Sequence, residues 1–472
     1  MRNTSSTRHA LRTRCLGNYI DSRLSTAVIV ATTVIVVADV VMEYTFKSFV
    51  VSARGRLVGG PRRMIATLCI CLVSLPACVH LVPRKSSELF SDVPSLEFPA
   101  PIRTLTPDNR YVQIPSASIA QHLQAHRPGE PIRILALSGG GAGGAFGAGA
   151  LVGLTQSGRR PEFAVVTGVS AGALIAPYAF LGPAWDRELA EIYTTGASER
   201  VLQSRGLGAV FGSSLYRGLP LRQLVDRFAT DALISAVARE ASRGRLLLVA
   251  TTNLETAELT IWDLGAIAMN GGPNARALFC DVLVAAASVP GIFPPVVIKV
   301  PGDNTWRDET HVDSAFSSPF FVEPAPQELP EDVRGMPPNT VYVLIDTQLT
   351  EPVRGTRRRA TSILTRSIDV GLSGTLRTNL ELTAARTEQR GIELNYAAIP
   401  AGYPYRGTLD FNVAAVKALF QYGYDCASAG RLWTTFGHSS AAENRAREAL
   451  VTRDLMCPTD DQFIAHFAQS QR

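Results

Sequence analysis

Cysteine and charge are scarce in this sequence, and each scarcity excludes a class of protein. The 472 residues include only 7 cysteines and no C-x-x-C spacing, which argues against a disulfide scaffold, a zinc site and a thioredoxin-like redox site. Charged residues make up 18% of the chain, and the formal net charge is only +5. A nucleic-acid-binding protein usually carries a denser basic surface, so we expect no nucleic-acid partner.

Hydrophobic residues are abundant, at 46% of the chain, which is enough apolar surface for a large folded core. Changes in composition divide the chain into four parts. We expect residues 1–80 to be an N-terminal extension with a signal or membrane segment, and residues 81–130 to be a linker rich in proline, serine and charge. The main folded domain, which the motifs below mark as the catalytic one, is expected at residues 131–437, followed by a C-terminal tail at 438–472.

Two apolar runs near the N-terminus, 24–38 and 64–79, are both shorter than the roughly 20 residues that a spanning helix needs. The second follows Arg62 and Arg63, and this order of positive charge and short apolar stretch is typical of a secretory signal. It contains Leu-Pro-Ala-Cys, which resembles a bacterial lipobox with Cys78 as the lipidated residue. A translation start just before Arg62 and a location in the bacterial cell envelope would follow. A membrane anchor or an uncleaved signal is the alternative.

A glycine-rich segment, 138–147, lies between a predicted buried strand at 132–137 and a predicted helix. This arrangement points backbone N–H groups at an anion, which is either a phosphate or the oxyanion of an acyl-transfer intermediate. Three of its glycines match the dinucleotide pattern G-x-G-x-x-G. However, the next predicted strand, 163–167, is not followed by the acidic residue that would bind a ribose. Phosphate binding is therefore disfavoured.

The pentapeptide Gly168-Val-Ser170-Ala-Gly172 directly follows that next strand and precedes a predicted helix at 171–181. A G-x-S-x-G in this context is typical of a nucleophile elbow, where Gly168 and Gly172 relieve the steric clashes of a sharp turn. Ser170 is therefore the candidate nucleophile. A helix that simply starts with small residues is the alternative.

A serine nucleophile needs a base, and the histidines downstream offer no clear one. His438 and His466 do not follow predicted strands, so we expect both to be surface residues. His311 precedes Asp313 by two residues, and on a strand both would face the same side. We expect His311 to be solvent-facing or hydrogen-bonded, with a place in the site as the alternative.

Three segments taken together, 138–147, 168–172 and 311–315, resemble the patatin-like phospholipases. The resemblance covers about residues 131–430, with support from the stretches at 248–258 and 285–295. It implies an α/β protein with a three-layer α/β/α fold and a mostly parallel central sheet. We also expect no metal and no cofactor, since the sequence has no cluster of metal ligands. The resemblance also implies a Ser–Asp dyad in which Ser170 attacks an ester carbonyl and Asp313 accepts its proton. The oxyanion hole would then be formed by the N–H groups of Gly139, Gly140 and Gly141.

The sequence departs from the family pattern at two positions. Gly143 stands where the family's glycine loop usually has a basic residue, so any role of that cation is lost or moved. Ser314 replaces the glycine that usually follows the aspartate, and it would be strained if that position takes a positive φ.

The interpretation is a membrane-tethered serine lipid acyl hydrolase, of phospholipase A or lysophospholipase type, that acts through an acyl-enzyme. Its expected partners are a phospholipid or another acyl ester and a membrane surface, whereas the oligomeric state stays unknown. One alternative is an esterase or thioesterase using the same dyad. Another is a catalytically silent lipoprotein that binds lipid in the same pocket.

The remaining features are weaker. An arginine run at 354–359 is expected to be a solvated loop or helix start, with attraction to anionic head groups as the alternative. Cys280 is expected to be buried, and Cys426 and Cys457 could pair in an oxidising compartment. Further predicted elements are strands at 341–345 and 392–399 and helices at 359–388 and 411–430.

Overall fold

A computed structural model describes residues 102–105, 111–114, 117–204, 213–301, 306–325, 329 and 339–436. The predicted signal and apolar runs, Cys78, Cys457, His438, His466 and the C-terminal tail lie outside these residues. Within them, no helix combines the length and the apolar character needed to cross a membrane.

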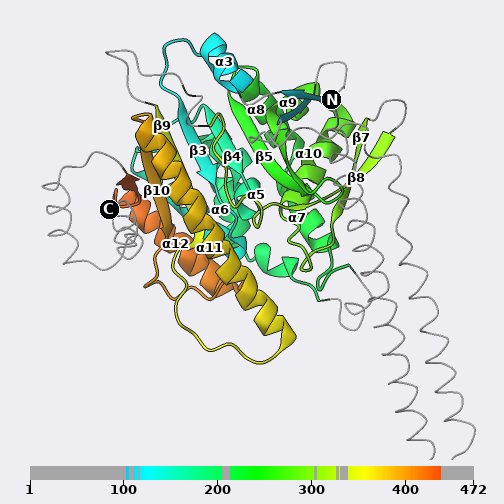
Figure 1. Cartoon of the computed structure of the whole chain (residues 1–472), viewed down its shortest axis with the longest axis vertical. Coiled ribbons are helices and arrows are strands. Elements are labelled where there is room, and N and C mark those ends of the chain that lie inside the picture. Colours follow the sequence, from blue (N-terminus) through cyan, green and yellow to red (C-terminus); the bar gives the residue numbers. More distant parts are fainter. Residues whose placement is uncertain are drawn as a thin grey trace, which may run out of the picture. The chain divides into compact units, whose positions relative to one another are not determined.

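A mostly parallel sheet forms the centre of the described fold (Figure 1). Five neighbouring strands run parallel, in the order β10-β9-β3-β4-β5. Their bounds are β3 (Arg133–Leu137), β4 (Val165–Gly168), β5 (Leu246–Asn253), β9 (Thr340–Gln348) and β10 (Glu393–Ile399). The other strands extend this centre: β1 (Ile102–Leu105), β2 (Tyr111–Ile114), β6 (Glu258–Asp263), β7 (Val296–Pro301), β8 (Trp306–Asp313) and β11 (Thr434–Phe436).

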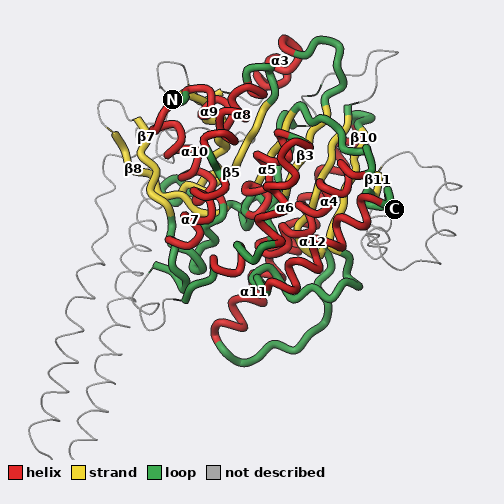
Figure 2. The backbone as a smooth tube through the Cα atoms, turned by 180° about the vertical axis from the view of Figure 1, so that it is seen from behind, coloured by secondary structure: helices red, strands yellow, loops and turns green. Residues whose placement is uncertain are grey.

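Helices cover both faces of the sheet. In Figure 1 α11 (Ala360–Gln389) lies across the near face, over β9 and β10. Seen from behind in Figure 2, the other face is covered by α4 (Gly144–Gln156), α5 (Ala171–Leu181), α6 (Asp186–Thr194) and α12 (Val413–Ser428). The remaining helices are α3 (Ala117–His126), α7 (Leu219–Phe228), α8 (Asp231–Ala241), α9 (Leu264–Asn270) and α10 (Gly272–Ala286), with short 3-10 turns that include η2 (Gly141–Gly143).

Successive side chains along a strand point alternately into two hydrophobic cores, one on each face of the sheet. In β3, Leu135 and Leu137 pack in the core that contains Phe146 of α4, whereas Ile134 and Ala136 pack in the core that contains Leu376 of α11. A parallel sheet buried on both faces requires apolar side chains on both, which is why the strands read as continuous apolar runs. The three-layer α/β/α fold expected from the sequence is therefore confirmed.

The expected linker at 81–130 is wrong for its second half. Residues 102–105 and 111–114 are strands β1 and β2, and β1 pairs in parallel with β6. Helix α3 follows, and its Ile119 and Leu123 are buried in the second core. This segment shows no local periodicity because its order comes from pairing with a strand about 150 residues further along the chain.

One detail of the sheet decides where the functional residues lie. Along one side of β5, β6 is paired from Leu248 to Asn253. On the other side of β5, two strands pair with it one after the other. The first half of β5 pairs with β4, up to Gly168 opposite Val249. Its second half pairs with β8, with Asp313 opposite Thr251. The end of β8 therefore lies directly beyond the end of β4.

Candidate active site

Ser170 occupies the turn between β4 and α5 in a strained conformation. Its φ of 54° and ψ of −123° lie in a region that residues with a side chain rarely adopt. The flanking glycines are required by close contacts: a Cβ on Gly172 would lie 2.6 Å from the Leu137 carbonyl oxygen, and one on Gly168 would lie 2.7 Å from the Ala173 Cα. This backbone is that of a nucleophile elbow, as the pentapeptide predicts.

Asp313 ends β8 and is brought beside Ser170 by the strand exchange on β5. Its backbone N–H donates to the Ser288 carbonyl at 3.0 Å, and its Oδ1 accepts from the Ala315 N–H at 2.8 Å. Burial raises the pKa of Asp313 to about 7, although the Ser170 hydroxyl and the Ala315 N–H both favour the ionised form. A carboxylate with a pKa near neutrality is a far better proton acceptor than an exposed one.

The second carboxylate oxygen of Asp313 is the one that remains available. Oδ2 is buried and has no hydrogen-bond partner of normal geometry among the described residues. The Ser170 hydroxyl is nevertheless close enough to lower the pKa of the carboxyl. In unliganded enzymes such catalytic contacts are often not yet fully formed and tighten when substrate binds.

The glycine loop presents fewer free N–H groups than expected. The Gly139 N–H donates to the Pro319 carbonyl at 2.9 Å, so its predicted role as an oxyanion donor is corrected. Gly139 instead provides space: a Cβ there would lie 3.2 Å from the Ser170 Cβ and 2.9 Å from the Ala315 Cβ. The N–H groups of Gly140 and Gly141 have no hydrogen-bond acceptor among the described residues.

One candidate oxyanion donor, the backbone N–H of Ala171, was not predicted from the sequence. Ala171 is the first residue of α5, and the first N–H groups of a helix have no partner within the helix. The next two are occupied, because the Gly172 N–H donates to the Ser138 carbonyl and the Ala173 N–H to the Ser170 carbonyl. The Ala171 N–H has no acceptor in the described part of the chain. Its place directly after the nucleophile is the signal that could have identified it.

The back of the glycine loop is held against two backbone carbonyls. A Cβ on Gly140 would lie 2.0 Å from the Asp346 carbonyl oxygen. Gly141 has a φ of +54°, and a Cβ there would lie 2.1 Å from the Thr408 carbonyl oxygen, which accepts from the Ala142 N–H at 2.8 Å. A Cβ on Gly143 would lie 1.8 Å from the Asp346 carbonyl oxygen. This explains the departure from the family pattern, since no basic side chain fits there.

Asp346 is a buried acid that the sequence did not reveal. It lies near the end of β9, and its Oδ1 accepts from the Gly147 N–H in the first turn of α4 at 3.1 Å. Burial raises its pKa well above the ordinary value. Its backbone N–H is hydrogen-bonded to the Ser138 hydroxyl at 3.0 Å. Asp346 therefore connects the start of the glycine loop to the helix that follows it.

His311 is fully buried and hydrogen-bonded, so the solvent-facing alternative is wrong. Its Nε2 lies 3.1 Å from a Glu309 carboxylate oxygen, and its Nδ1 lies 2.9 Å from the Thr251 hydroxyl. Both ring nitrogens are occupied, which leaves neither to accept a proton from Ser170. Ser314 has no positive φ, so the strain considered for this position does not arise.

An apolar pocket starts one helical turn beyond the nucleophile. Its wall includes Leu174 and Tyr178 of α5, Leu224 and Phe228 of α7, and Leu283 of α10. The space enclosed there is small, about 30 Å³, which is room for one or two water-sized groups and not for a whole acyl chain. Leu174 is four residues after Ser170, which on a helix is about 6 Å along the axis.

Comparison with known proteins finds one matching family. A model of the family described as patatin-like phospholipase matches residues 135–326, which include both Ser170 and Asp313. Among solved structures, the crystal structure of VipD from Legionella pneumophila is similar over 75% of this chain and 74% of that chain, at 10% identity. Its TM-score of 0.29 is too low to carry an argument. No curated protein matches.

Proposed function

Since residues 135–326 form a patatin-like phospholipase domain, we propose that this protein is a serine lipid acyl hydrolase, of phospholipase A or lysophospholipase type, with Ser170 and Asp313 as its catalytic dyad. The observation that carries the proposal is the pairing of a strained serine with a buried carboxylate. The serine is buried, with 4% of its surface exposed, at a turn that only its glycine neighbours permit. The carboxylate has a pKa of about 7 and an oxygen without a partner.

The reaction follows from these positions. The Ser170 Oγ attacks the ester carbonyl carbon while its proton passes to Asp313 Oδ2. The carbonyl oxygen becomes an oxyanion that accepts from the N–H groups of Gly140, Gly141 and Ala171. Its collapse releases the alcohol, which takes the proton from Asp313, and leaves an acyl group on Ser170. Water then attacks the acyl-enzyme with Asp313 again as base, releasing the fatty acid.

The apolar pocket along α5 is the proposed place for the acyl chain, whose binding would require the side chains of the pocket to move apart. Its wall is almost entirely apolar, and Leu174 lies close to the nucleophile on the same helix. A long hydrocarbon chain would bury apolar surface there at about 25 cal/mol per Å². The apolar character of the lining is the reason to propose a lipid in preference to a small water-soluble ester or thioester.

A location at a membrane of the bacterial cell envelope completes the proposal, with Cys78 as the lipidated residue. Cys426 is in a disulfide bond, and disulfides persist in oxidising compartments outside the cytosol. Its predicted partner, Cys457, lies outside the described residues. Cys280 is free and buried, as expected.

Active-site labelling tests the proposal. A fluorophosphonate probe should label the full-length protein on Ser170, and mass spectrometry of the modified peptide would identify the site. Labelling should vanish in Ser170→Ala, fall by orders of magnitude in Asp313→Asn, and persist in the surface control Ser242→Ala. A folded wild type that takes up no probe would favour the catalytically silent lipid-binding alternative. Hydrolysis of long-chain lysophospholipid and diacyl phospholipid, against short-chain thioesters, separates the enzymatic alternatives.

A further inference from the structure

An apolar and basic surface lies near the carboxyl ends of the parallel strands, the same end of the sheet as the catalytic dyad. The loop 349–359 leaves β9 at its carboxyl end, the edge at which β4 ends before Ser170. In Figure 1 the N-terminal end of α11 projects beyond this edge. We define the docking face as the exposed residues of this loop, the first half of α11 and the turn after Asp313, namely Phe316, Val353, Arg357, Arg358, Arg359, Ile363, Leu364 and Val370.

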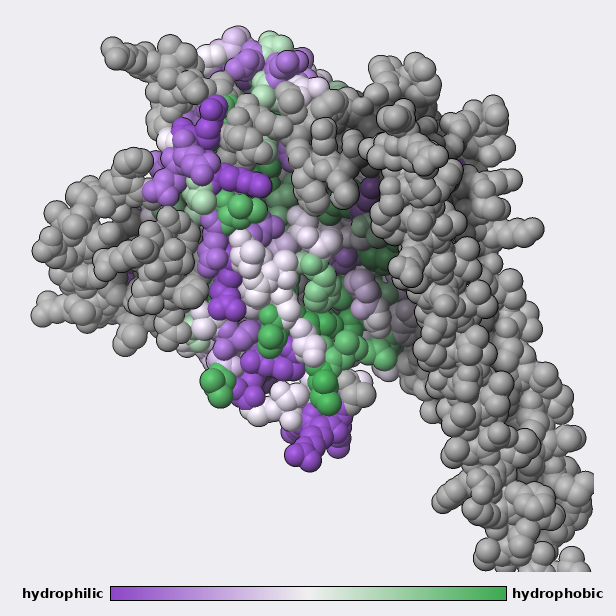
Figure 3. All heavy atoms as spheres, viewed as in Figure 1, coloured by the Kyte–Doolittle hydropathy of each residue, from purple (hydrophilic) through white to green (hydrophobic). Residues whose placement is uncertain are grey.

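The apolar members are unusually exposed for large hydrophobic side chains. Val353 is 106% exposed, and Ile363 and Val370 are each about half exposed. Phe316, at 41%, lies beside Gly371 of α11, so the turn that follows Asp313 adjoins the helix. Figure 3 shows hydrophobic atoms gathered at this lower end of the molecule, next to strongly hydrophilic ones. Single exposed apolar residues are common, but a cluster marks an interaction site.

The charge exposed on this face has one sign. Arg357, Arg358 and Arg359 are exposed and have no ion-pair partner among the described residues. The acidic residues between 351 and 375 are Glu351 and Asp369, and both are largely buried in ion pairs with arginines. A face with exposed apolar side chains and unpaired cations is complementary to the surface of an anionic bilayer.

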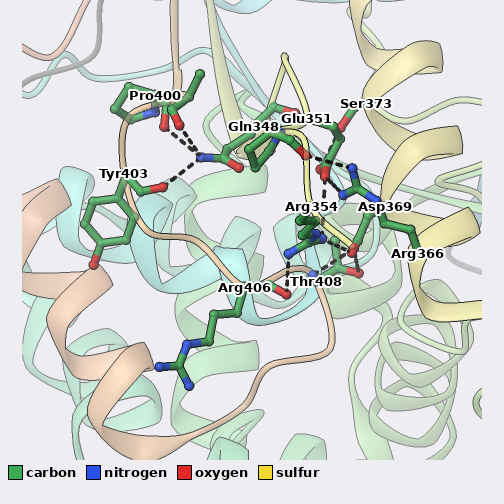
Figure 4. Close-up of polar contacts among 12 residues, drawn as sticks. Gln348, Glu351, Arg354, Arg366, Asp369, Ser373, Pro400, Tyr403, Arg406 and Thr408 are labelled. Atoms are coloured by element: carbon green, nitrogen blue, oxygen red, sulfur yellow. Dashed lines mark hydrogen bonds and ion pairs between the residues drawn. The ribbon is translucent and has the colours of Figure 1, made fainter. Parts of the chain in front are cut away.

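Ion pairs hold the face in shape (Figure 4). Arg354 donates to Asp369 Oδ2 at 2.7 Å and to the Arg406 carbonyl at 2.9 Å, which fastens the loop to α11 and to the segment after β10. Arg366 of α11 pairs with Glu351 and donates to the Pro352 carbonyl at 3.0 Å. The loop that carries Val353 and the three free arginines is therefore fixed against the helix that carries the apolar residues.

We propose that the docking face binds the surface of an anionic phospholipid bilayer and brings the dyad to its substrate. This rests on the proposed function for the identity of the substrate, but the binding itself does not require catalysis. The apolar side chains enter the boundary between head groups and acyl chains, and the arginines contact the anionic head groups.

Local insertion can be measured in the full-length protein despite any membrane affinity of its N-terminal region. Tryptophan replaces Ile363 in one variant and, as the matched control, Leu382, which is 48% exposed on the second half of α11. Vesicles of phosphatidylcholine with half phosphatidylglycerol, carrying brominated acyl chains, should quench the Ile363→Trp fluorescence beyond that of the wild type. The Leu382→Trp fluorescence should stay unquenched. Equal quenching at both positions, or none at Ile363→Trp, would overturn the proposal.

The arginines are tested by charge removal. The triple variant Arg357→Gln, Arg358→Gln, Arg359→Gln should bind the anionic vesicles roughly a hundredfold more weakly. Each basic residue near such a surface increases the binding constant about fivefold, and three are removed. The matched control removes three exposed arginines elsewhere, Arg187, Arg239 and Arg243. Unchanged binding of the first triple variant would contradict the proposal. A second outcome would also contradict it. If the fluorescence of Ile363→Trp shifts when the protein concentration is raised without vesicles, the face binds a second copy of the chain.

A water-soluble ester separates this proposal from the proposed function. All these variants should hydrolyse p-nitrophenyl butyrate at the wild-type rate, which also shows that they are folded. If the wild type binds vesicles as described but hydrolyses no ester and takes up no fluorophosphonate, the docking face stands and the enzymatic proposal fails.

Discussion

Replacing Asp313 by asparagine should stabilise the protein while abolishing its activity. The side chain is buried, and burial raises its pKa from an ordinary 3.8 to about 7. Between about pH 4 and pH 7 the folded protein holds a proton that the unfolded chain has released, so the stability of the wild type falls by about 1.4 kcal/mol for each pH unit. Over the whole interval this amounts to about 4 kcal/mol, which is lost in full above pH 7. Asparagine has no such titration and can still accept from the Ala315 N–H.

The assay compares wild type and Asp313→Asn by denaturant unfolding from pH 4 to pH 8.5. Their difference in unfolding free energy should grow in favour of the variant, by about 4 kcal/mol between the two ends, with its steepest change between pH 4 and pH 7. Taking the difference removes the contribution of other buried acids, such as Asp346 and Asp263, that both proteins share. A difference that does not change with pH would refute the assignment of Asp313 as a buried carboxylate with a raised pKa.

Three further predictions follow from the same site. The kcat/KM for a soluble ester should rise about tenfold per pH unit up to about pH 7 and then level off, since Asp313 must be ionised to accept the proton; a midpoint near pH 4 would contradict this. Gly172→Ala should lower the midpoint of thermal unfolding and abolish probe labelling, because its Cβ would lie 2.6 Å from two backbone oxygens. The control Gly374→Ala, in an open position of α11, should be neutral or stabilising. Leu174→Trp should fill the apolar pocket and reduce the preference for dodecanoyl over butanoyl p-nitrophenyl esters at least tenfold, with Leu382→Trp as the unaffected control.

The sequence predicts those parts of the fold whose cause is local. The elbow helix has the predicted bounds, Ala171–Leu181, and helix α11 differs from its predicted range by one residue at each end. Strands β3, β9 and β10 coincide with the apolar runs from which strands were predicted. In each case the pattern that determines the element lies within the element itself.

What the sequence does not predict depends on distant contacts. Strand β1 has no apolar pattern and is ordered by β6. The direction of the Gly139 N–H is set by the Pro319 carbonyl, about 180 residues away, and a peptide orientation of this kind has no sequence signal. Asp346 reads as an acid at the end of a strand, and only its burial behind the glycine loop gives it a role.

Asp369 has a consequence for how the rate of turnover responds to lipid. Its Oδ1 accepts from the Thr408 N–H at 3.0 Å and from the Thr408 hydroxyl at 2.9 Å, and the Thr408 carbonyl holds the turn of the glycine loop. One helix thus supports both the surface assigned to the bilayer and the backbone that stabilises the transition state. A shift of α11 against lipid would therefore reach the glycine loop through the bonds between Asp369 and Thr408. Adsorption would then alter the intrinsic speed of each molecule as well as the fraction of molecules adsorbed.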